Sequence, residues 1–370
     1  GRLPGGLPGR ADLGDRAVVG GDDDARPGLH GAQGRAQAGL EFFHAEDEIR
    51  VSDGPNYDYG TDDLRVTRLR YIQRGLLSNV LSGEHRLGFL EPLVADWKFG
   101  YSEASRGEPD RRESIYEGDG SGMLALSQRN QIGLTRIFGE MKEHDRSAYG
   151  NLTLPFHVWS GREAKAKAGV AWRLRNRVSS FRRLGFALGY QGATTLDLTM
   201  PPESLLADEN IRPGHFTLVE TTRENDTYAA RQEIRATYAL LDMNILPRLR
   251  TAGGARVETS DQTVETKSPF VSTAKETYVA LRDTDILPAL NVTWGLREGM
   301  NVRASYGMTV SRPELREMSP FDMYDYETGF TEIGNPAIQS TPIRNYDLRW
   351  EQYPGAREIL AVSVFHKEID

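Results

Sequence analysis

The feature that most constrains this chain is a strict two-residue alternation. In the stretch NVRASYGMTVS, residues 301 to 311, apolar and polar side chains take turns without a break. Successive side chains of a β-strand point to opposite faces, whereas the same order on a helix would scatter polar groups around the whole circumference. The pattern therefore predicts a strand with one apolar and one polar face.

The same alternation recurs in AKAKAGVAWRLR, residues 164 to 175, in LPALNVTWGL, residues 287 to 296, and in TPIRNYDLRWE, residues 341 to 351. Reading the chain in this way predicts about ten strands. They cover residues 64–82, 92–104, 144–158, 163–184, 227–243, 247–260, 278–296, 300–312, 342–353 and 357–370. The polar faces of these strands are strongly charged, and they would suit the interior of a sheet that encloses water or a plug. The charged positions are Lys165, Lys167, Arg173, Arg175, Arg303, Asp347, Arg349 and Glu351.

Composition removes several classes of protein. The net charge of -8 argues against nucleic-acid binding, which normally needs a basic surface. The 370 residues include no cysteine, so disulfides, thiolate metal sites and cysteine nucleophiles are excluded. The seven histidines show no metal-ligand spacing, and we expect no metal, cofactor or catalytic residue. No apolar run is long enough for a transmembrane helix, but strands of a β-barrel can cross a bilayer with alternating residues.

The lengths of the connections give an independent test, because they were not used to find the strands. Short and long connections alternate along the chain: WSGRE is short, residues 185–226 are long, MNILP is short again, and this order continues to YPGAR. Short turns at one rim and long loops at the other are typical of an up-and-down outer-membrane barrel. Trp159, Trp294 and Trp350 lie near short turns, where an interfacial aromatic girdle is expected.

A set of motifs in the last sixty or so residues makes the pattern more specific. Ser311-Arg312-Pro313 ends a strand, Gly334-Asn335-Pro336 closes the loop that follows, residues 345–350 read NYDLRW, and Tyr353-Pro354-Gly355 forms a turn. In order and spacing these motifs resemble the barrel of the TonB-dependent outer-membrane receptors, and the resemblance covers roughly residues 64 to 370. Proline cannot continue a paired interior strand, so Pro313 suits the end of one.

The resemblance implies an all-β fold: a transmembrane antiparallel up-and-down β-barrel with short periplasmic turns and long extracellular loops. We expect a partial barrel of about ten strands out of the about 22 of large transporters. Residues 1–39 lack periodicity and are expected to form an irregular or disordered lead. Residues 40–370 would be the barrel, without the plug domain and the last strands.

The resemblance also implies a function in transport rather than catalysis. The expected role is energised uptake of an extracellular ligand, most often a ferric siderophore, across the outer membrane of a Gram-negative bacterium. The expected partners are outer-membrane lipid, a TonB-type energy-transducing complex and the ligand. No nucleic acid is expected. Two other interpretations stay open: a soluble secreted β-rich protein that binds or acts on carbohydrate, and a passive porin-like channel.

The loop between residues 313 and 341 supplies the candidate ligand contacts. Aromatic side chains on an exposed loop offer large amphipathic surfaces at a low entropic cost. The candidates are Arg312, Phe321, Tyr324, Tyr326 and Phe330. The alternative is that the aromatic rings pack the loop onto its neighbours.

Overall fold

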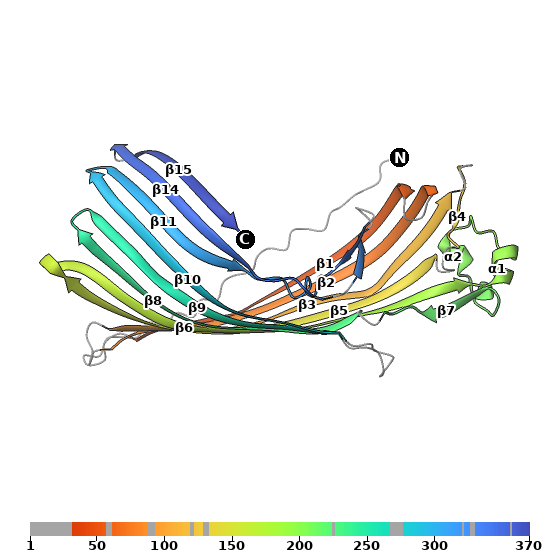
Figure 1. The fold of residues 1–370 in the computed structure, drawn as a ribbon. Coiled ribbons are helices and arrows are strands. Elements are labelled where there is room, and N and C mark those ends of the chain that lie inside the picture. Colours follow the sequence, from red (N-terminus) through yellow and green to blue (C-terminus); the bar gives the residue numbers. More distant parts are fainter. Residues whose placement is uncertain are drawn as a thin grey trace, which may run out of the picture.

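A computed structural model describes residues 32–56, 61–87, 93–118, 122–128, 133–223, 226–266, 277–319, 322–325, 330–355 and 357–370. Within these ranges, 13 strands form one sheet and two more form a small hairpin. Every neighbouring pair is antiparallel, and the central order is β1-β2-β3-β5-β6-β8-β9-β10-β11-β14-β15. The sheet curves into an open trough, with β1 and β15 at its two edges (Figure 1).

Most strands are long, and helices are few and short in the described ranges. The strands are β1 (Ala32–Asn56), β2 (Thr61–Arg86), β3 (Val94–Gly118), β4 (Leu124–Leu126), β5 (Leu134–Val158), β6 (Arg162–Leu188), β7 (Phe216–Glu220), β8 (Thr227–Leu246), β9 (Leu249–Thr266), β10 (Thr277–Arg297), β11 (Met300–Ser311), β12 (Asp322–Asp325), β13 (Phe330–Ile333), β14 (Thr341–Gly355) and β15 (Glu358–Ile369). The helices are α1 (Tyr190–Thr195), α2 (Pro202–Leu205) and the short 3-10 helices η3 (Trp159–Gly161) and η4 (Asp208–Asn210). No helix in the described ranges is long and apolar enough to cross a membrane.

All ten strands predicted from the alternation are present, and short turns join them at one end of the trough (Figure 1). One prediction of detail is wrong. The stretch between the predicted strands 92–104 and 144–158 is largely strand, because β3 continues to Gly118 and β5 begins at Leu134. The segment 185–226 is the long connection between β6 and β8 that the sequence predicts, and it contains α1, α2, η4 and β7.

An additional strand, β1, precedes the first predicted one. It begins at Ala32, inside the stretch for which the sequence shows no periodicity, and residues 1–31 lie outside the described part. Its charges are paired across the sheet: Glu46 receives a hydrogen bond of 3.0 Å from Arg74, and Glu48 forms an ion pair with Arg70. Cross-strand pairing therefore lets a polar segment serve as a strand.

The register separates two faces, as the alternation predicts. In β10, β11 and β14 the residues Trp294, Val302 and Trp350 pair across neighbouring strands on one face, while Thr293, Arg303 and Arg349 pair on the other. Large apolar side chains of the first face lie exposed along the trough, among them Leu152, Leu154, Val170, Ile286, Leu290, Leu348, Val362 and Val364. A solvent-exposed apolar face of this extent is what a lipid-facing sheet requires.

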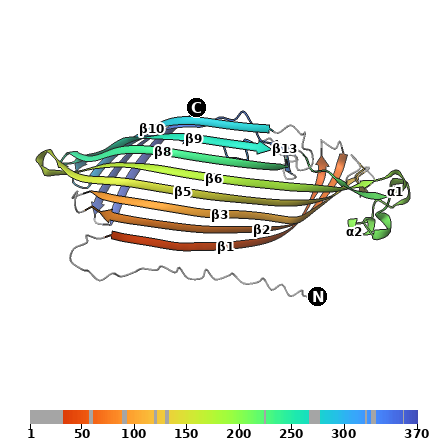
Figure 2. The same ribbon diagram turned by 90° about the horizontal axis from the view of Figure 1, so that it is seen from below.

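The other face is the concave one. Seen from below, the long strands run side by side along the length of the trough (Figure 2). The chain between β11 and β14 returns on the concave side, over the sheet (Figure 1). The polar face of the strands therefore lines the inside of the trough, and the apolar face forms its outside.

Candidate functional site

The concave face carries a ladder of ion pairs between β5 and β6. Asp145 accepts from Arg173 at 2.6 Å, and Glu143 pairs with Arg177 at 2.5 Å. Arg175 lies between them, 3.5 Å from Glu143 and 3.6 Å from Asp145. A third carboxylate, that of Glu314 in the segment after β11, lies 3.9 Å from Arg175, so the three guanidinium groups of the ladder face three carboxylates. Lys165 and Lys167 continue the same alternate row of β6.

A second cluster lies on the concave face near the short turns. Arg303 and Arg349 are directly opposite each other on β11 and β14. The buried carboxylate of Glu351 accepts a hydrogen bond from Arg303 at 3.1 Å and one from Arg349 at 2.7 Å. It also accepts one from the hydroxyl of Tyr353 at 3.0 Å. The carboxylate offsets the repulsion that two like charges facing each other would otherwise produce. A cavity of about 440 Å³ opens beside this cluster, lined in part by Arg250 and Asn291.

The segment after β11 is fixed to the concave face by its first residues. The guanidinium of Arg312 donates from Nη1 to Oε2 of Glu258 at 2.7 Å and from Nη2 to the carboxylate of Asp285. The side-chain amide of Gln262 donates to the carbonyl oxygen of Pro313 at 3.0 Å. Three contacts with β9 and β10 therefore turn the chain inward as soon as β11 ends.

Apolar packing continues this attachment. Leu315 and Met318 are completely buried, and they pack against Val264 of β9 and Val279 of β10. Tyr228 of β8 belongs to the same cluster. Together with the Arg312 contacts, this cluster forms the seat of the loop, by which we mean residues 312–319 and their contacts with β8, β9 and β10.

The two motifs that bracket the loop in sequence meet in space at this seat. The main-chain N–H of Asn335 donates to the carbonyl oxygen of Glu317 at 2.7 Å. Gly334 approaches the main chain of residues 316–319 so closely that an added Cβ would collide with the carbonyl oxygen of Ser319. Ser340 then donates to Asp283 at 2.5 Å before β14 begins. These contacts close the base of the loop.

The five predicted ligand contacts have different positions. Arg312 lies buried in the seat, paired with two carboxylates. Tyr324 is in β12, where it pairs with Thr331, and Phe330 is in β13, where it pairs with Asp325. Phe321 and Tyr326 lie outside the described residues. Sequence reasoning did not single out Glu258, Asp285 or Gln262, and the only signal for them is their place among the polar positions of β9 and β10.

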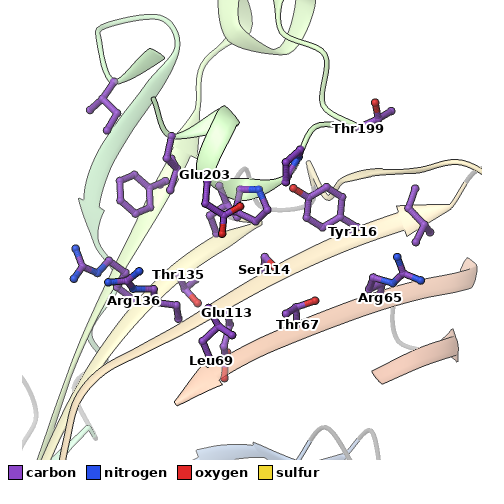
Figure 3. Close-up of a pocket in the computed structure, with 18 of the residues that line it drawn as sticks. Arg65, Thr67, Leu69, Glu113, Ser114, Tyr116, Thr135, Arg136, Thr199 and Glu203 are labelled. Atoms are coloured by element: carbon purple, nitrogen blue, oxygen red, sulfur yellow. The ribbon is translucent and has the colours of Figure 1, made fainter. Parts of the chain in front are cut away.

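A larger cavity, of about 930 Å³, lies at the end of the sheet where the long loops are. Strands β2, β3, β5 and β6 form its floor, and the segment that contains α2 forms its opposite wall (Figure 3). The hydroxyl of Tyr116 donates to the carbonyl oxygen of Met200 at 2.7 Å and so joins the two walls. Burial, together with the nearby charge of Glu203, raises the pKa of Tyr116 to about 12.

Among the described residues, no group of three or more histidine, aspartate or glutamate side chains is arranged to hold a metal ion. The polar groups of the trough are instead arranged as pairs and ladders of arginine with carboxylates. Such an arrangement can bind and orient a charged molecule or a charged protein surface.

One family model matches nearly the whole chain. The family described as "TonB dependent receptor-like, beta-barrel" matches residues 8–370. No curated protein matches the sequence. Among solved structures, a double mutant of the Serratia marcescens hemophore receptor HasR, in complex with its hemophore HasA and heme, is 11% identical, with a TM-score of 0.44 over 92% of this chain and 52% of that one.

Two further solved structures are similar to the same degree. The ferric-catecholate import receptor Fiu from Escherichia coli, in its closed form, is 12% identical, with a TM-score of 0.42 over 91% of this chain and 56% of that one. The ferric yersiniabactin uptake receptor FyuA from Yersinia pestis is 11% identical, with a TM-score of 0.39 over 91% of this chain and 52% of that one. The chain thus spans about half the length of these solved structures.

Proposed function

This chain belongs to the family of TonB-dependent receptor β-barrels, and from that premise we propose that it takes part in the energised uptake of an extracellular ligand across an outer membrane. The observation that carries the proposal is the strict sidedness of the sheet. Exposed apolar rows on the convex face suit lipid, and paired charges on the concave face suit an aqueous lumen. A soluble two-layer protein would cover the apolar rows with a second layer.

The ligand belongs to the proposal as well. Ferric siderophores are the expected class, and the row of lysine and arginine side chains on the concave face of β6 offers cationic donors to a ligand that carries negative charge. We propose that the loop after β11 contacts the ligand through Phe321, Tyr324, Tyr326 and Phe330. In this proposal Arg312 serves the contact by holding the loop at its seat.

The experiment that tests this function is uptake in a Gram-negative host that expresses the gene from which this chain comes. Accumulation of ⁵⁵Fe supplied as a panel of ferric siderophores is measured in hosts with and without a working TonB complex. For at least one siderophore, we expect ⁵⁵Fe accumulation that requires both the gene and a working TonB complex. Accumulation that needs the gene but not TonB would instead support a passive channel.

Localisation is tested in parallel on the same cells. The protein is expected in the outer-membrane fraction, from which only detergent releases it. Heated and unheated samples should differ in gel mobility, as is typical of a stable barrel. Recovery in the soluble periplasmic or secreted fraction would contradict the proposal. It would favour the soluble carbohydrate-binding alternative.

A further inference from the structure

The large cavity at the loop end of the sheet, hereafter the outer-wall cavity, lies outside the trough. Its floor contains one row of side chains across four strands, in which Thr67 pairs with Ser114, Ser114 with Leu134 and Leu134 with Phe186. Strand β5 pairs with β6 without a register shift from Leu134 to Val158. Leu134 therefore shares a face with the exposed Leu152, and this row of the floor lies on the convex side of the sheet.

The outer-wall cavity also lies beyond the part of the sheet that lipid can cover. Arg136, at its edge, is 16 residues from Leu152 along β5, a distance of about 53 Å at about 3.3 Å per residue. Even with a strand tilt of about 45°, this is a height of about 37 Å, which exceeds the hydrocarbon thickness of about 30 Å. An occupant would therefore come from water rather than from the bilayer.

Apolar side chains line both walls of the cavity, and five charged side chains also line it: Arg65, Arg112, Glu113, Arg136 and Glu203. The apolar side chains come from both walls and include Leu134, Phe186, Leu206 and Ile211. The hydroxyls of Thr67 and Ser114 lie on the floor between them (Figure 3). A cavity of this size, with apolar side chains on both walls and convergent polar groups, has the properties of a small-molecule site.

The edge of the cavity at Arg112 and Arg136 has an excess of positive charge, because Glu113, which also lines the cavity, is paired with Arg68 and Arg111. Arg136 donates to both oxygens of Asp110, each at 2.9 Å, and Arg112 donates to the same carboxylate at 2.9 Å. Two guanidinium groups thus share one carboxylate, and both line the cavity while Asp110 does not. Each guanidinium has five N–H donors, so this pairing leaves donors for an additional anion. Glu203 lies on the opposite wall, and its negative charge disfavours binding of an anionic group on that wall.

We propose that the outer-wall cavity binds a water-soluble amphipathic organic anion, with its carboxylate or phosphate at Arg112 and Arg136 and its apolar body against Leu134 and Phe186. This site is additional to the uptake route along the concave face. It would give the protein a second class of extracellular ligand, recognised without entry into the lumen.

The test uses the full protein in nanodiscs of neutral phosphatidylcholine and three probes with one apolar body. The probes are 2-naphthoate, 2-naphthyl phosphate and the uncharged 2-naphthalenemethanol, titrated by isothermal calorimetry. We expect one-to-one saturable binding of both anions, at least about tenfold tighter than the alcohol, as a charge-assisted hydrogen bond can provide. Arg136→Gln should weaken anion binding at least about tenfold and leave the alcohol unchanged.

Arg182→Gln is the matched control. Arg182 lies on the same face of β6, two residues from Leu184, and is paired with Glu220 at 3.1 Å, but it does not line the cavity. Its replacement should change no affinity by more than about twofold. No saturable binding of either anion, equal affinity for the alcohol, or equal effects of the two arginine substitutions would each overturn the proposal.

A cavity-filling variant keeps the test decisive if Arg136→Gln fails to fold. Thr67→Trp adds an indole to the floor of the cavity at a strand position, where aromatic residues are well accepted. Its fold is verified by circular dichroism and by the mobility shift on heating. We expect this variant to lose binding of all three probes. Unchanged binding of the anions would refute the assignment of the site.

Discussion

Arg312 and Glu258 lie 54 residues apart in sequence, yet the guanidinium Nη1 and the carboxylate Oε2 are 2.7 Å apart in the seat of the loop. Both side chains are nearly buried. The same seat also buries polar atoms that have no partner among the described residues, namely Nε of Arg312, Oε1 of Gln262 and the hydroxyls of Ser260 and Ser319. Each such atom costs about 1–3 kcal/mol. The Arg312 pairs therefore have to offset a substantial desolvation cost.

Replacing Arg312 by glutamine should release the loop. The carboxylate of Asp285 would stay largely buried without its cation, and Glu258 would keep only its pair with Arg256, at a cost of about 3 kcal/mol. We expect the loop to become sensitive to protease while the sheet stays intact, and the affinity for the transported ligand to fall. Arg344→Gln is the control, because Arg344 pairs with Glu368 at the exposed surface. Equal protease sensitivity of the two variants would contradict the role of Arg312.

Replacing Gly334 by alanine should open the base of the loop by a different route. The added Cβ would collide with the carbonyl oxygen of Ser319 and lie 2.8 Å from that of Glu317, and both are main-chain atoms. Overpacking of this kind costs about 1–3 kcal/mol. The measurement is hydrogen exchange of the Asn335 amide, which should become faster. Gly307→Ala is the control, since its Cβ would meet nothing within 4 Å.

The alternation was sufficient to predict the strands near the membrane but not their far ends. Between Glu108 and Gly118 both faces of β3 carry polar or charged residues, because this part lies beyond the lipid and neither face needs to be apolar. β1 was missed for a related reason: Glu46 and Glu48 are balanced by Arg74 and Arg70, and only the register reveals that pairing. Hydrophobic periodicity predicts a strand only where one face of that strand is apolar.

The seat of the loop could not be predicted from the sequence for a similar reason. Arg312 was found from its motif, but its partners Glu258 and Asp285 lie on strands formed 54 and 27 residues earlier. Their positions look like any other polar position in an alternating strand. The register of β9, β10 and β11 brings the three side chains together, and no local feature of the sequence specifies that register.

Glu351→Gln should destabilise the end of the sheet near the short turns. The neutral amide would leave Arg303 and Arg349 facing each other without the shared anion. Because both arginines are about half exposed, solvent screening limits the cost to about 1 kcal/mol. The expected result is a lower unfolding midpoint in detergent that rises again with added salt, since salt screens like charges. A midpoint that does not depend on salt would argue against repulsion as the cause.

Tyr116 should ionise only at a high pH. Its pKa is raised from 10.0 to about 12 by burial and by the charge of Glu203. The protonated phenol donates a hydrogen bond to the carbonyl oxygen of Met200. The contribution of this hydrogen bond to stability is therefore complete below about pH 10 and is lost as the pH rises through about 12. The absorbance at 295 nm is titrated for the wild type and for Tyr116→Phe. Their difference should show one group with a midpoint near 12, and a midpoint near 10 would show that the phenol is not buried.

Two neighbouring substitutions to arginine test which face of the sheet meets lipid. Leu348 is exposed on the convex face of β14, and Ser305 of β11 lies on the concave face opposite Asp347. An arginine on the lipid face near the middle of the bilayer costs about 2–4 kcal/mol. Leu348→Arg should therefore reduce the amount of folded protein in the outer membrane. Ser305→Arg should be tolerated, because Asp347 can pair with it in water. If the two variants insert equally well, the convex face does not meet lipid, and the orientation on which the uptake proposal depends is wrong.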